Sequence, residues 1–271
     1  MLSPALVQGV VIAGAGIVLF FAPTLSNDIW GWELTPFNTR FLGGIYLAAI
    51  VPFVALAVVR HWVPARLVMP MDGLFTGIIL LVSLSYLDQF KWERPVTWAW
   101  FLIFVTVPIY SVYFLWRFRR LSIMEPVTPH SHLWSELTRL GLRGAALALA
   151  VYGAGLLAAP GTFASFWPWP VDSFHGRVYS GIFLSLALAG LIVAGAPASL
   201  ELVTLGLTCV ALGALQPIGL VVVNSNADTV DWSSAGTLAW LAMFAALVVY
   251  GLALTVAGLR RESPVPRAVQ T

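Results

Sequence analysis

The sequence predicts an all-α integral membrane protein of about eight transmembrane helices, built as two tandem, parallel four-helix repeats. Three observations support this prediction. Of the 271 residues, 59% are hydrophobic and only 10% are charged, whereas a soluble domain carries roughly 25% charged residues. Eight apolar runs are long enough to cross a bilayer. The two halves of the chain also resemble each other in sequence.

The apolar runs define the expected helices. A helix rises about 1.5 Å per residue and needs about 20 apolar residues to cross the hydrocarbon layer, where backbone groups must bond within their own segment. The first run lacks the basic start and the cleavage site of a signal peptide, so it is interpreted as a span. The expected spans are Ala5–Leu25, Phe41–Val59, Leu67–Leu87, Val96–Trp116, Gly141–Ala159, Val178–Gly195, Leu202–Val223 and Ala235–Leu259.

The distribution of basic residues predicts the direction of these spans. Ten of the 14 lysines and arginines fall on the connections of one side, and the other four are Arg40, Lys91, Arg94 and Arg177. Basic connections stay in the cytoplasm, so both termini are expected there, as an even number of spans requires. The expected location is a bacterial cytoplasmic (inner) membrane.

An internal duplication is visible without any structure. Gly16–Ala48 aligns without a gap with Gly153–Ser185, and 11 of the 33 positions are identical. The match resumes at an offset of 140 with Asp88 and Asp228. Copies with an even number of spans share one orientation, so a pseudo-twofold axis along the membrane normal is expected. The predicted boundaries are 1–120 for the first repeat, 121–138 for a cytoplasmic linker, 139–261 for the second repeat and 262–271 for a C-terminal tail.

A distinctive segment follows the first helix of each repeat, and we name residues 23–44 and 160–181 the two elbows. Pro23 and Pro160 end the preceding helices because proline lacks the N–H for the next backbone bond. Two tryptophans in each elbow are expected at the membrane interface. The structural interpretation is therefore a partly re-entrant interfacial segment held by tryptophan and arginine.

Two other interpretations of the elbows stay open. The elbows could form an outward-facing site for a carboxylate, a phosphate or a lipid headgroup, with arginine as the bidentate partner, or the arginines could simply reach lipid phosphates. Arg40 with Asp88, and Arg177 with Asp228, are predicted to form ion pairs within their repeats. The candidate binding residues are Trp30, Trp32, Arg40, Asp88, Trp167, Trp169, Arg177 and Asp228.

Two polar residues inside the apolar runs are further candidates. Asp72 is the ionisable residue deepest in a run, and intramembrane acids are often functional, although a helix that starts at Asp72 would account for it equally well. Gln216 precedes Pro217, where a helix break is expected, and packing is the favoured interpretation of both. The charges of Asp28, Glu33, Asp172 and His175 are expected to be solvated on loops.

Several chemistries lack a sequence signal. The single cysteine, Cys209, lies in an apolar run and is expected to be a small buried residue. The four histidines lie at or outside the span ends, which disfavours haem ligation, and no nucleotide, hydrolase or zinc motif is present. A net charge of +2 does not suggest nucleic acid. We therefore expect no metal and no cofactor.

The string W-x-W-x-L-T-P-x-x-x-R-x-x-G, formed by Trp30, Trp32, Leu34, Thr35, Pro36, Arg40 and Gly43, resembles a signature of uncharacterised multi-span bacterial membrane proteins. In the second elbow Trp167, Trp169 and Arg177 are retained, but Ser180 replaces the glycine. The resemblance covers about a quarter of the chain and implies no activity.

Three classes of function remain. The leading hypothesis is a non-catalytic structural or accessory component of a membrane assembly, with the lipid bilayer, other membrane proteins or a second copy as partners. The second is a facilitative carrier or binder of a lipid-like or neutral solute, which would need a cavity between the repeats lined by Thr76, Gln216 or Asn224. The third, a lipid-modifying enzyme, would need Glu33, Asp72 and His175 to converge.

Overall fold

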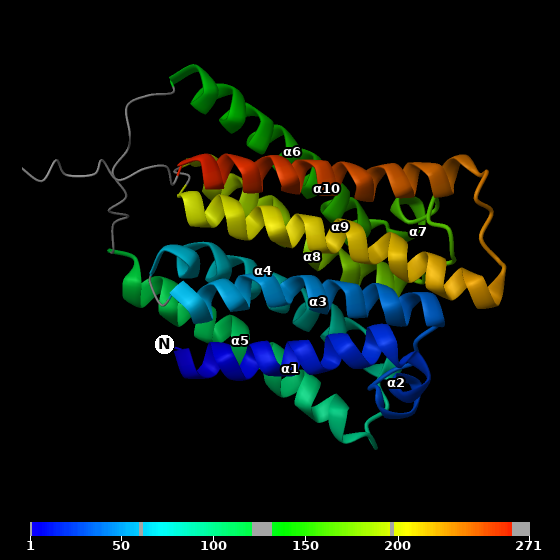
Figure 1. Cartoon of the computed structure of the whole chain (residues 1–271). Coiled ribbons are helices and arrows are strands. Elements are labelled where there is room, and N and C mark those ends of the chain that lie inside the picture. Colours follow the sequence, from blue (N-terminus) through cyan, green and yellow to red (C-terminus); the bar gives the residue numbers. More distant parts are fainter. Residues whose placement is uncertain (1, 60–61, 121–131, 196–197, 262–271) are drawn as a thin grey trace, which may run out of the picture.

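The computed structural model describes residues 2–59, 62–120, 132–195 and 198–261 (Figure 1). In these ranges the chain forms helices and connections, without a strand. The helices are α1 (Leu2–Phe21), α2 (Pro23–Ile29), α3 (Pro36–Val59), α4 (Trp62–Ser85), the 3-10 helix η1 (Leu87–Gln89), α5 (Pro95–Phe118), α6 (His132–Ala158), α7 (Pro160–Phe163), α8 (Ser173–Gly195), α9 (Ser199–Ala227) and α10 (Ala235–Arg261).

The predicted class of membrane protein is confirmed at this level. In the described ranges, seven helices are long and apolar enough to cross a membrane. An eighth span is obtained if α1 and α2 count as one, although the chain bends by 118° between them. Pro23 and Pro160 begin α2 and α7 directly after the ends of α1 and α6, as expected where proline interrupts the backbone bonding.

One expected helix break and one alternative helix start are wrong. Helix α4 begins at Trp62, so Asp72 lies well inside it and does not start it. Helix α9 runs from Ser199 to Ala227 with Pro217 in its interior, so no break occurs there. A break would expose several backbone groups in an apolar environment, whereas an interior proline removes only one hydrogen bond.

The linker and the tail predicted from the sequence lie largely outside the described residues. Helix α6 begins at His132, so residues 132–138 of the predicted linker are helical. Residues 121–131 and 262–271 are not among those described.

Two of the main helix contacts join distant parts of the chain. Helix α3 packs against α9, and α4 packs against α8, whereas the sequence neighbours α3 and α4 touch little, as do α8 and α9. Outside these four helices, α1 packs on α3, α5 on α4, α6 on α8 and α10 on α9. The larger hydrophobic core therefore includes residues of both halves, whereas a smaller cluster around Phe53 and Met69 belongs to the first half alone.

Glycines permit the closest of these contacts. A Cβ atom added at Gly251 of α10 would lie 2.5 Å from the carbonyl oxygen of Gly206 on α9, and one added at Gly43 of α3 would lie 2.7 Å from the backbone nitrogen of Phe20 on α1. Such distances leave no room for a side chain. Small residues of this kind let apolar helices gain dispersion contact where lipid removes the usual hydrophobic driving force.

The start of α1 and the elbows lie at opposite ends of the bundle. The beginning of α1 and the end of α10 lie at one end, whereas α2 and α7 both lie at the opposite end (Figure 1). We call the latter the elbow end. The two elbows meet there although more than 100 residues separate them in the sequence.

Candidate functional site

The elbow tryptophans point into the protein. Trp30, Trp32, Trp167 and Trp169 are only 6%, 2%, 6% and 5% exposed, so these indoles are packed inside the protein. An indole buries a large apolar area and needs only one hydrogen-bond acceptor. For Trp32 and Trp169, the other elbow and the last helix of the same half supply that apolar surface.

Each elbow donates a hydrogen bond to the other. Trp32 Nε1 donates to His175 Nε2 at 3.2 Å, and Trp169 Nε1 donates to Asn38 Oδ1 at 3.0 Å. Asn38 and His175 occupy the same position in the gapless alignment of the two elbows. The two hydrogen bonds are therefore equivalent: in each elbow the second tryptophan donates to the residue of the other elbow that aligns with Asn38 or His175.

The aromatic contacts follow the same pattern. The ring of Trp32 meets Phe174 edge-on at 5.5 Å, and the ring of Trp169 stacks on Phe37 at 5.4 Å. Each of these tryptophans also packs against a tryptophan of the last helix of its own half, at 4.6 Å for Trp32 and 5.6 Å for Trp169; the partners are Trp100 and Trp240. Aromatic pairs at such distances contribute about 0.5–1.5 kcal/mol each beyond area burial.

His175 is held in one tautomer by its neighbours. Its Nε2 atom accepts from Trp32, so its Nδ1 atom carries the proton and donates to the carboxylate of Asp172. Burial raises the pKa of Asp172, but the hydrogen bonds from His175 and from the backbone of Phe174 outweigh this effect and lower the pKa overall. The expectation of a solvated His175 is wrong, and both of its ring nitrogens are occupied.

The ion pairs predicted for the two arginines do not form in the described part of the chain. Arg177 instead donates from Nε to the carbonyl oxygen of Leu157 at 3.0 Å and from its terminal nitrogen to the hydroxyl of Tyr86. Asp88 accepts from its neighbour Gln89, and Asp228 forms the left-handed C-cap of α9. Asp88 lies in η1 and Asp228 lies at the end of α9.

Asp72 and Gln216 are both buried in contacts between helices. Gln8 of α1 donates its amide to both carboxylate oxygens of Asp72, at 3.0 and 2.8 Å. Gln216 of α9 donates to the carbonyl oxygen of Phe41 on α3 at 3.2 Å, while its own side-chain oxygen has no partner among the described residues. These bonds connect helices and agree with the packing interpretation.

A charge pair with a fully buried carboxylate was not predicted from the sequence. The guanidinium of Arg66 on α4 pairs with the carboxylate of Glu201 on α9 through two of its nitrogens. The Glu201 side chain is fully buried and also accepts the backbone N–H of Ala198 at 3.3 Å. In the sequence these residues resemble ordinary charges at helix ends, because nothing indicates that α4 and α9 meet.

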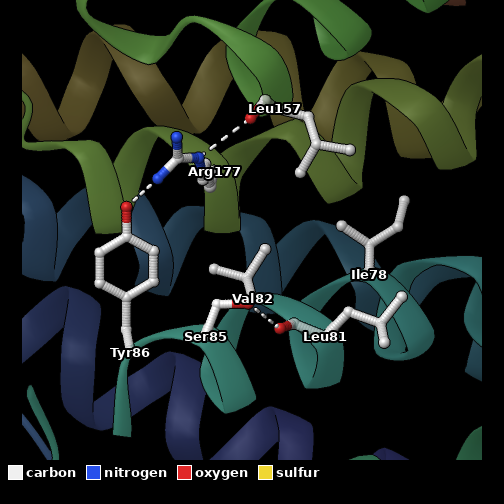
Figure 2. Close-up of a pocket in the computed structure, with 7 residues that line it drawn as sticks. All are labelled: Ile78, Leu81, Val82, Ser85, Tyr86, Leu157 and Arg177. Carbon is white, nitrogen blue, oxygen red and sulfur yellow. Dashed lines mark hydrogen bonds between the residues drawn. The ribbon is translucent and has the colours of Figure 1, made fainter. Parts of the chain in front are cut away.

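A cavity of about 260 Å³ lies on the flank of the bundle near the elbow end. Arg177 and Tyr86 form its polar end, and the other lining residues are Ile78, Leu81, Val82, Ser85 and Leu157 (Figure 2). The residues that a solute path between the repeats would need do not line this cavity. Thr76, Gln216 and Asn224 are each less than 8% exposed and bonded within the protein.

The residues proposed for an enzyme site do not share a site. Asp72 bonds to Gln8, Glu33 pairs with Lys91 on the surface, and His175 bonds to Trp32 and Asp172. Along α4, Asp72 lies 13 residues before the end at Ser85, or roughly 20 Å from the elbow end. In the described ranges, no three histidine, cysteine or acidic residues are grouped to hold a metal ion.

Comparison with known proteins yields no relative. No family model matches the chain, and neither a curated protein nor a solved structure matches it significantly. The functional conclusion therefore depends on the contacts of this chain alone.

Proposed function

We propose that this protein is a non-catalytic, multi-span structural or accessory component of a membrane assembly. The support comes from the way its buried polar side chains are used. Trp32 and Trp169 each bond to the opposite elbow, Gln8 bonds to Asp72, and Arg66 bonds to Glu201. Each of these bonds joins segments of the protein to one another, which rigidifies the bundle.

The observation that carries this proposal is the exposed face of α5. This helix packs chiefly on α4, and a stripe of large apolar side chains along it is between 42% and 66% exposed. The stripe consists of Trp98, Leu102, Val105, Ile109, Val112 and Trp116. Its alternating spacing of four and three residues is the period at which one helix packs along another, so a partner transmembrane helix is the proposed occupant.

Photo-crosslinking in native membranes tests this proposal. A photoreactive residue placed at Ile109 or Val112 should give a discrete protein adduct. The same residue at Phe104, which is 5% exposed on the same helix, should give none. Val10 of α1, which is 72% exposed, reports ordinary contact with lipid. Lipid adducts alone at Ile109 and Val112, as at Val10, would overturn the accessory role.

We further propose that the chain consists of two tandem, parallel repeats with both termini in the cytoplasm of a bacterial cell. The matched contacts of α3 with α9 and of α4 with α8, together with the reciprocal elbow bonds, support a pseudo-twofold relation. Reporter fusions after Thr271 and within the connection that holds Asp231 should report opposite compartments. The same compartment for both would contradict the topology.

A carrier or binder of a lipid-like or neutral solute is the second candidate. The flank cavity beside Arg177 favours a binder over a carrier. A lipid-modifying enzyme has less support because Glu33, Asp72 and His175 have separate partners. The likeness of the elbow string to uncharacterised bacterial membrane proteins is part of the proposal and adds no activity to it.

A further inference from the structure

The flank cavity changes from polar to apolar along the helix axis. Arg177 lies in the first turns of α8, and Tyr86 directly follows α4, so both lie where spans end. From Tyr86 to Ile78 the cavity follows α4 for eight residues, or roughly 12 Å. In Figure 2 the guanidinium and the tyrosine hydroxyl lie to one side, and the side chains of Ile78, Leu81 and Val82 lie to the other.

The charge of Arg177 is not neutralised within the described part of the chain. The ion pairs found there do not include it, and its two hydrogen-bond acceptors, Leu157 and Tyr86, are uncharged. These bonds and the ring of Tyr86, 5.5 Å below the guanidinium, hold the group in place. They use two of its five N–H donors, so the remaining donors can bind a phosphate in the bidentate manner typical of arginine.

The cavity is also open to the surroundings of the bundle. Leu81, on its wall, is 66% exposed, while Val82 and Ile78 behind it are buried. A ligand can therefore enter sideways from the lipid. A fixed cation at the span ends above an apolar trench is complementary to a headgroup phosphate with an attached acyl chain.

We propose that this cavity binds one anionic phospholipid, with its phosphate on Arg177 and an acyl chain along Val82, Leu81 and Ile78. The site goes beyond the accessory role proposed above and does not depend on it. The bound lipid supplies the negative charge that the predicted partner Asp228 does not supply.

The other half of the chain offers a natural control. Arg40 and Phe20 align with Arg177 and Leu157. Phe20 is only 4% exposed, and its ring lies beside Gly219, next to the Cβ atom of Arg40. A phenylalanine ring therefore packs near the arginine of this half, at the aligned position that Leu157 occupies in the other half. Leu157→Phe should close the cavity without removing the arginine.

Native mass spectrometry of the delipidated protein in detergent micelles tests the proposal. The wild-type protein should bind one phosphatidylglycerol at least tenfold more tightly than phosphatidylcholine. Arg177→Gln should lower the affinity for phosphatidylglycerol about tenfold, as expected for the loss of a charged hydrogen-bond donor. Leu157→Phe should have an effect of similar size while Arg177 stays in place, and Arg40→Gln should change the affinity less than twofold.

Three results would overturn the assignment of a lipid site: equal binding of the two lipids, wild-type affinity in Leu157→Phe, or an equal loss in Arg40→Gln. Glycerol phosphate added at the concentration of the lipid should not displace it, since it lacks the acyl chain; displacement would mean a site for free phosphate compounds instead. Leu157→Phe keeps the proposal testable if Arg177→Gln does not fold, because it leaves both bonds of the guanidinium intact.

Discussion

Replacing Glu201 by glutamine should destabilise the protein far more than the same replacement at Glu33. Both carboxylates pair with a basic side chain, but the Glu201 side chain is fully buried and that of Glu33 is 88% exposed. Breaking a buried ion pair costs about 3–5 kcal/mol because the remaining charge is left without compensation. An exposed pair contributes about 0–1 kcal/mol.

The magnitude follows from the exposure of the partners. Arg66 is 22% exposed, so water partly solvates the guanidinium that Glu201→Gln leaves behind, and we expect a cost of about 2–4 kcal/mol. The glutamine also weakens the acceptor of the Ala198 N–H at the start of α9, which contributes to this cost. Glu33→Gln should cost less than about 1 kcal/mol.

Reversible unfolding in mixed detergent micelles, followed by circular dichroism, measures both changes. A double-mutant cycle of Glu201→Gln with Arg66→Met isolates the interaction itself, and a coupling free energy of about 1.5 kcal/mol or more is expected for a buried pair. The matched cycle of Glu33→Gln with Lys91→Met should give about 0.5 kcal/mol or less. Equal coupling in the two cycles would refute the reasoning from burial.

Three further predictions concern the elbows and the helix contacts. Trp169→Phe leaves the buried Asn38 oxygen without its donor and should cost about 1–3 kcal/mol of unfolding free energy; no loss would show that this bond is dispensable. Gly251→Ala places a Cβ atom 2.5 Å from the backbone of α9 and should lower the free energy of unfolding by about 1–3 kcal/mol. Gly144→Ala, with open space at its Cβ position, should be neutral or slightly stabilising. The pKa of Asp172 is lowered in the folded protein, so the ionised carboxylate stabilises the fold fully above the ordinary pKa of an aspartate, and this stabilisation is lost as the pH falls through the lowered pKa. The difference in melting temperature between wild type and Asp172→Asn should therefore shrink in acid. A difference that stays constant with pH would contradict this.

The elbows show how far the sequence predicted the candidate site. Trp30, Trp32, Trp167 and Trp169 are visible as a repeated pair, and the sequence predicted their depth near the membrane interface but not that the protein buries them. Their hydrogen-bond acceptors, His175 and Asn38, were missed because the comparison of the two repeats selected identical residues, and these two differ. The available signal was that both side chains can accept a hydrogen bond from an indole N–H.

The arginines show where the sequence comparison led to a wrong prediction. The repetition of an arginine and an aspartate in each half suggested ion pairs, but repetition carries no information about side-chain direction. Arg177 bonds to Tyr86 and Leu157, and neither residue stands out in the sequence. Distances across the bundle decide such pairings, and these follow from how the helices cross.

The sequence by itself determined that the helices of this protein suit a lipid environment, and it determined the local structure. Apolar runs of about 20 residues must form helices in lipid, because backbone groups find no water there, and proline sets where several of them begin or end. The structure decided that α3 packs on α9 and α4 on α8, that Glu201 meets Arg66, and that Arg177 lies at the end of a cavity. Hydropathy is a property of each segment alone, whereas contacts between helices depend on the complementary shapes of two surfaces that lie far apart in the chain.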